Sequence, residues 1–137
     1  MTYGALFSTQ LVRDGRYAEA IETATREIAT QPDEPEAFFN RGQALACLAR
    51  FEEAAADYQR ALALDDSASS VDPESIDDEL FFALRSAAEL RKGEPAEAIR
   101  TLERYRQILP HGRHVDDIAK WRDSFNGVET VWVRERA

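Results

Sequence analysis

Apolar side chains recur along the chain at steps of three and four residues, which places them on one face of a helix. One series consists of Tyr17, Ala20, Ile21, Ala24 and Ile28, and its counterpart consists of Phe51, Ala54, Ala55, Tyr58 and Leu62. Each series follows a short turn, DGRY or ARFE, and each turn follows another helical segment. The pattern therefore predicts units of helix, tight turn and helix.

This unit occurs three times. The copies align on Gly15, Ala49 and Gly93, which lie 34 and then 44 positions apart. The ten extra residues fall in DDSASSVDPESIDDE, a polar and acidic stretch that we interpret as an inserted loop. The first helix of each copy is predicted at residues 3–14, 36–48 and 79–92.

The chain is predicted to form a single domain. Proline is a helix stop signal, and Pro32 and Pro110 follow the second helices of the outer copies. An amphipathic helix at 114–125 is expected to seal the end of the stack. The predicted boundaries are repeat 1 at about 1–34, repeat 2 at about 35–68, the acidic loop at about 66–78, repeat 3 at about 79–112, and the capping helix with its tail at about 113–137.

The second copy has small, aromatic or leucine residues at five characteristic positions, namely Phe38, Gly42, Leu45, Ala54 and Tyr58. It departs from the same pattern at Arg41, where leucine is usual, and at Asp66, where proline is usual. This 34-residue pattern resembles the tetratricopeptide repeat. The resemblance implies an all-α fold, a right-handed α-solenoid of three helix-turn-helix repeats with a C-terminal capping helix.

The resemblance also implies a concave wall, built by the first helices, that binds an extended peptide or a partner helix. The wall is predicted to be largely apolar. Its predicted binding residues are Leu6, Thr9 and Arg13 in the first copy, Phe39, Asn40, Gln43 and Cys47 in the second, and Ala83, Leu84, Ala87 and Arg91 in the third. Asn40 is the strongest candidate, because its amide can both donate to and accept from a peptide backbone. The alternative is a bond from Asn40 to an adjacent helix.

The amino-acid composition of the chain limits the classes of partner that it is expected to bind. The net charge of −9 disfavours nucleic acid and anionic membrane surfaces as partners. Cys47 is the single cysteine, and no apolar run is long enough for a bilayer span, so we expect a cytoplasmic protein. A basic clamp for chaperone carboxylates is not expected, since Ala5, Leu80 and Leu84 stand at three of its positions.

Neither catalysis nor a cofactor or metal site is expected. His111 and His114 have no cysteine or carboxylate at a zinc-ligand spacing, and the acidic loop lacks the pattern of a calcium loop. We therefore predict a non-enzymatic adaptor or scaffold that binds a protein partner. The alternatives are a self-assembling structural module and a secretion-type chaperone for an unfolded client. The apolar tail 128–137 is predicted either to pack on the capping helix or to extend into a groove, in this molecule or a neighbouring copy.

Overall fold

The computed structural model describes residues 6–64 and 71–125, and these residues form helices and turns without any strand. The helices are α1 (Phe7–Arg13), α2 (Tyr17–Thr30), α3 (Pro35–Cys47), α4 (Phe51–Ala63), α5 (Pro73–Glu89), α6 (Pro95–Ile108) and α7 (Asp117–Phe125). The predicted all-α class is therefore confirmed. Within the described residues, none of these helices combines the length and apolar composition that crossing a bilayer would require.

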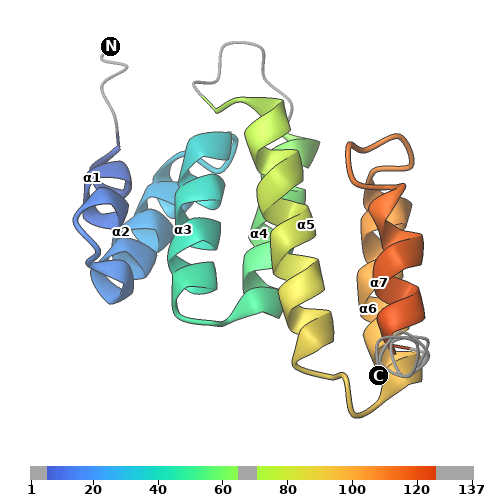
Figure 1. Cartoon of the computed structure of the whole chain (residues 1–137). Coiled ribbons are helices and arrows are strands. Elements are labelled where there is room, and N and C mark those ends of the chain that lie inside the picture. Colours follow the sequence, from blue (N-terminus) through green and yellow to red (C-terminus); the bar gives the residue numbers. More distant parts are fainter. Residues whose placement is uncertain (1–5, 65–70, 126–137) are drawn as a thin grey trace. The chain divides into compact units, whose positions relative to one another are not determined.

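The chain divides into two compact units, with the division after Leu80 inside α5. In the first unit, α1 packs on α2, α2 on α3 and α3 on α4, and α1 also contacts α3 (Figure 1). Consecutive first helices thus lie against each other, as stacked helix pairs require. In the second unit, α6 packs on α7. The single-domain organisation stays a prediction.

Small residues recur at equivalent buried positions of the repeat. Ala20, Ala54 and Ala98 occupy the same position in the three copies, and each is fully buried. At Gly42, an added Cβ would lie only 2.6 Å from the ring of Tyr58. Tyr58 is itself fully buried, so the close approach of α3 to α4 depends on the absence of a side chain at Gly42.

The turns within the first two helix pairs share one backbone device. Gly15 has φ of 77° and Ala49 has φ of 61°, so both residues adopt the left-handed conformation that ends a helix. The side chain after each turn then pairs with a glutamate three residues on, Arg16 with Glu19 at 2.6 Å and Arg50 with Glu53 at 2.8 Å. The 34-residue period is therefore repeated in the contacts as well as in the sequence.

Several helix boundaries differ from the prediction, and the starts of α1, α5 and α7 differ most in position. Helix α5 begins at Pro73, inside the predicted loop, because Asp72 accepts a hydrogen bond from the Glu74 amide at 3.1 Å and caps the helix. Helix α1 begins at Phe7 and α7 at Asp117, both later than predicted. The predicted tail at 128–137 lies outside the described residues.

His114 lies in the turn that precedes α7. In the second unit, the ring of His114 stacks on Phe81 with centroids 4.5 Å apart, and its backbone amide donates to the Tyr105 hydroxyl at 3.0 Å. Its Nδ1 lies 3.3 Å from Asp117 at the start of α7. These contacts fix the turn between α6 and α7.

Candidate functional site

The first unit contains a groove of about 660 Å³, here called the central groove, between the exposed sides of α1, α3 and the start of α5. Helices α1 and α3 contribute side chains one helical turn apart, since each presents one face. The groove is lined by Thr9, Val12 and Arg13 from α1, by Glu36, Phe39, Asn40 and Gln43 from α3, and by Val71, Asp72, Ser75 and Glu79 at the start of α5.

The structure brings together five of the eleven predicted binding residues. Thr9, Arg13, Phe39, Asn40 and Gln43 all line the central groove. Which of these residues touch a ligand stays a prediction.

The other six predicted residues lie elsewhere. Leu6 lines a separate groove between α1 and α2. Cys47 is exposed at the end of α3, Arg91 is exposed in the turn after α5, and neither lines the central groove. Three residues of α5 are buried, with at most 2% of their surface exposed, and present nothing for a ligand to contact: Ala83, Leu84 and Ala87. The central groove is consequently more polar than the largely apolar wall that was predicted.

Sequence reasoning expected α5 to contribute to the wall but missed the residues at and before its start that line the groove. Val71, Asp72 and Ser75 were assigned to the inserted loop, and Glu79 was placed at the start of the predicted helix 79–92 without a binding role. The available signal was the sequence Asp72-Pro73-Glu74, a helix start, which places Ser75 and Glu79 one turn apart on one face.

Asn40 belongs to a hydrogen-bonded chain that joins three helices. Its Nδ2 donates to the hydroxyls of Ser8 at 2.9 Å and Thr9 at 2.8 Å. Those hydroxyls donate in turn to the carboxylates of Glu27 at 2.5 Å and Glu36 at 2.7 Å. The alternative interpretation of Asn40, a bond to an adjacent helix, is therefore what the structure shows for its amide nitrogen.

The same chain fixes which way the Asn40 amide points. Each hydroxyl has a single hydrogen, and in Ser8 and Thr9 that hydrogen is given to a carboxylate, so both oxygens must accept from Asn40. The two N–H groups of Asn40 are thereby used. Among the described residues, no donor reaches its carbonyl oxygen Oδ1, although the side chain lines the central groove and Asn40 is only 3% exposed.

Glu79 and Tyr58 form a partly desolvated pair beside this groove. Burial raises the pKa of Glu79, and the neighbouring Asp78 raises it further, while the Tyr58 hydroxyl opposes this shift. Burial also raises the pKa of Tyr58. The two groups lie close enough to influence each other, but no hydrogen bond of standard geometry joins them, and the buried Tyr58 hydroxyl lacks a partner among the described residues.

On another side of α3, the departure at Arg41 from the repeat pattern is explained by a buried partner. The Arg41 guanidinium makes two hydrogen bonds to the Asp57 carboxylate, at 2.8 and 2.9 Å. Arg60 adds a third bond to Asp57 at 2.8 Å, and Arg41 also donates to Thr25 at 3.2 Å. Since the Asp57 side chain is only 2% exposed, this ion pair is largely withdrawn from water.

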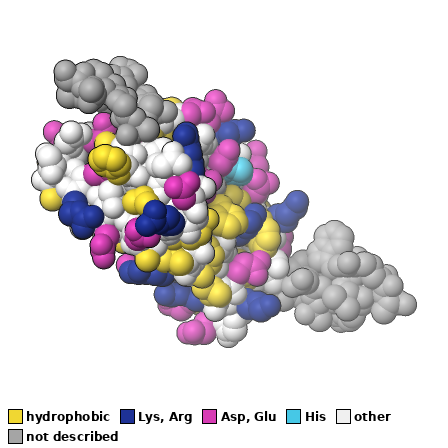
Figure 2. All heavy atoms as spheres, turned by 90° about the vertical axis from the view of Figure 1, so that its left-hand side faces the viewer, with side chains coloured by type: hydrophobic (Ala, Val, Ile, Leu, Met, Phe, Trp, Pro, Cys, Tyr) yellow, Lys and Arg dark blue, Asp and Glu magenta, His cyan; other side chains and the backbone are white. Residues whose placement is uncertain are grey.

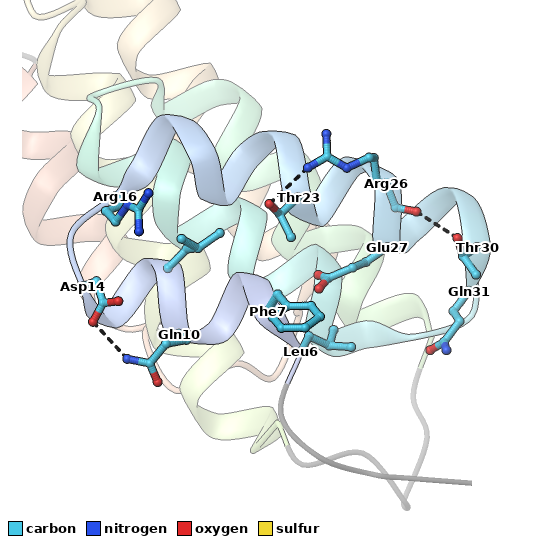
Figure 3. A pocket seen from close by; sticks show the side chains of 11 residues that line it. Leu6, Phe7, Gln10, Asp14, Arg16, Thr23, Arg26, Glu27, Thr30 and Gln31 are labelled. Carbon is cyan, nitrogen blue, oxygen red and sulfur yellow. Dashed lines mark hydrogen bonds between the residues drawn. The ribbon is translucent and has the colours of Figure 1, made fainter.

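A second groove of about 640 Å³, here called the end groove, lies between α1 and α2 (Figure 3). Phe7 borders it with 80% of its surface exposed, and Leu6 and Glu27 lie beside Phe7. Asp14 and Arg16 lie at the opposite end of the groove. Seen from the α1 and α2 side, the molecule carries hydrophobic side chains interspersed with acidic and basic ones (Figure 2).

Comparison with protein families gives a match. Residues 7–69, which include all of α1 to α4, match the family model described as the tetratricopeptide repeat. No curated protein matches the chain. Repeats of this family are scaffolds for protein–protein interaction and are typically not enzymes. The pairing of α1 with α2 and of α3 with α4, the buried alanines and the close approach at Gly42 agree with that match. Residues 7–69 of the chain therefore belong to the tetratricopeptide-repeat family.

Proposed function

We propose that the protein is an adaptor that holds an extended segment of a partner protein in the central groove. The observation that carries this proposal is the convergence of three helices on one open groove in which Asn40 has an unused carbonyl oxygen. An extended peptide offers backbone N–H groups along its length, and a fixed acceptor can take one of them. Phe39, which is half-buried, offers an apolar surface beside that acceptor.

The preorganisation of the groove supports the same proposal. The orientation of Asn40 is set by two hydroxyls and two carboxylates before any ligand arrives. A ligand therefore does not have to bear the entropic cost of ordering that side chain. We assign the adaptor to the cytoplasm as part of this proposal.

A displayed library of random peptides, selected on the wild-type protein, tests the proposal. A selected peptide is expected to bind about tenfold more weakly to Phe39→Ala, because that variant removes an aromatic contact from the wall. Binding would be measured by fluorescence polarisation with the labelled peptide. Arg26→Ala, which changes an exposed residue on α2, serves as the control and should leave the affinity unchanged.

The proposal fails if the library yields no binder. It also fails if Phe39→Ala and Arg26→Ala bind every selected peptide as the wild type does. Phe39 contacts Tyr58 with ring centroids 5.7 Å apart, so Phe39→Ala also removes a contact within the fold. Circular dichroism of the three proteins therefore serves to exclude unfolding as the cause of a lost affinity.

Self-assembly is a second candidate function, and the exposed ring of Phe7 favours it. An aromatic side chain that is 80% exposed at the edge of a groove is available for contact with another copy. The end groove also contains both signs of charge, with Asp14 and Glu27 against Arg16 and Arg26. A second copy could therefore match its own charges across such a contact.

Phe7→Ser tests this second candidate. If copies associate through the end groove, the wild type is expected to gain apparent mass with rising concentration in light scattering, and Phe7→Ser is expected to stay monomeric. Its melting temperature should stay close to that of the wild type, because exposed substitutions usually change stability by no more than about 0.5 kcal/mol. A wild type that remains monomeric at high concentration removes the candidate.

A further inference from the structure

We propose that the central groove selects a partner segment carrying a lysine or arginine, whose cationic group lies between the carboxylates of α3 and α5. This inference rests on the proposed function, since it names the chemistry that the same groove recognises. It concerns the side-chain specificity of the site, whereas the proposed function concerns the binding of a polypeptide in general.

The charge of the groove is the first argument. Three carboxylates line it, those of Glu36, Asp72 and Glu79, and Arg13 is the one cation among the described lining residues. Glu36 comes from α3, whereas Asp72 and Glu79 come from the start of α5, so acidic groups stand on two of the three walls. A cationic segment would be attracted to these walls, and an anionic one would be repelled.

The unused oxygen of Asn40 is the second, independent argument. This residue is almost fully buried, its two N–H groups are used by Ser8 and Thr9, and its Oδ1 has no donor among the described residues. The polar group that this side chain offers to a ligand is therefore an acceptor. An ammonium or guanidinium group consists only of donors and requires several acceptors at once.

The environment of Glu79 points to the same chemistry. This carboxyl is partly buried, it is near Asp78, and its ionised form is disfavoured by both. Among the described residues, no ion pair of Glu79 with a lysine or arginine is found in the first unit. A ligand cation would compensate the desolvation that the carboxylate otherwise bears.

Apolar residues beside the carboxylates fit the stem of a long basic side chain. Val12, Phe39 and Val71 line the same groove as Glu36 and Glu79. Lysine and arginine can lay their methylene groups along such surface while the charged end reaches the carboxylates. A lining of both carboxylates and apolar residues thus suits a basic side chain better than a free inorganic cation, because such an ion would make no use of the apolar surface.

The experiment uses the full chain and compares the residues enriched at each position of a random displayed peptide library. We expect lysine or arginine to be enriched at one or more positions on the wild type. A selected basic peptide and a version with glutamine at that position would then be titrated against each protein. The glutamine version should bind the wild type about tenfold more weakly, since it loses a charge-assisted hydrogen bond.

Charge-neutralising variants locate the effect. Glu36→Gln and Glu79→Gln should each weaken the basic peptide about tenfold and leave the glutamine peptide nearly unchanged. The matched control is Glu22→Gln, which makes the same change of net charge at an exposed position of α2 outside the groove. Screening at physiological salt should limit its effect on peptide affinity to less than about twofold.

The outcomes separate this inference from the proposed function. Selected peptides without basic enrichment, whose binding still depends on Phe39, would overturn the inference and leave the adaptor proposal standing. An equal loss with Glu22→Gln would overturn it as well, because the effect would then come from overall charge. A synthetic peptide of residues 126–137 that binds as tightly as the selected peptides would overturn the assignment of the groove to a separate partner.

Discussion

Replacing Arg41 with leucine is expected to lower the free energy of unfolding by about 3 kcal/mol, even though leucine is the usual residue at this place in the repeat. The variant removes two of the three hydrogen bonds that hold the buried Asp57 carboxylate. The remaining partner is Arg60, whose side chain is 55% exposed. An incompletely compensated buried charge is the reason for the large effect.

Chemical denaturation measures this change, and a double variant supplies the control. Replacing both Arg41 and Asp57 with leucine removes the pair instead of half of it, and the double variant should recover most of the loss. Equal stability of Arg41→Leu and the wild type would contradict the interpretation. So would additive losses in the double variant, because they would mean that the two side chains act independently.

Replacing Gly42 with valine is the second change with a large expected effect, a loss of about 3 kcal/mol. The new Cβ would lie 2.6 Å from Cε1 and 2.9 Å from Cδ1 of Tyr58. This ring is fully buried and packs on Phe39, so it has little room to move away. Helix α3 would have to move away from α4, and this movement would open space in the core.

Thermal melting followed by circular dichroism tests the Gly42 prediction. The matched control is Gly93→Val, because an added Cβ at Gly93 meets nothing within 4 Å and its backbone is not left-handed. We expect Gly93→Val to stay within about 1 kcal/mol of the wild type. Equal melting temperatures for the two valine variants would show that the close contact at Gly42 does not limit the packing.

Much of the fold could be predicted because the sequence repeats. The period of 34 residues aligned Ala20 with Ala54, and the structure buries both completely. The start of α5 could not be placed in the same way, because the insertion breaks the period there. The predicted inserted loop contains Pro73, whereas in the structure Pro73 opens a helix that Asp72 caps.

The candidate site could likewise be predicted only where the repeat pattern applies. Register alone placed Thr9, Phe39 and Asn40 on one face, since the spacing within a helix determines which side chains share a face, and all three line the central groove. The same register, transferred to α5, selected Ala83 and Leu84, and these small and apolar residues pack in the core. The bond between Arg41 and Asp57 could not be predicted, because it joins two helices and the sequence gives no distances between them.

The hydrogen-bonded chain around Asn40 has a consequence for α1. This helix has only seven residues, too few to hold a helical conformation by itself in water. Ser8 and Thr9 are neighbours on α1, and they are tethered to Glu27 on one side and to Glu36 on the other. Rotating α1 about its own axis in either direction would break one of these hydrogen bonds, so the network holds the helix in a single rotational orientation.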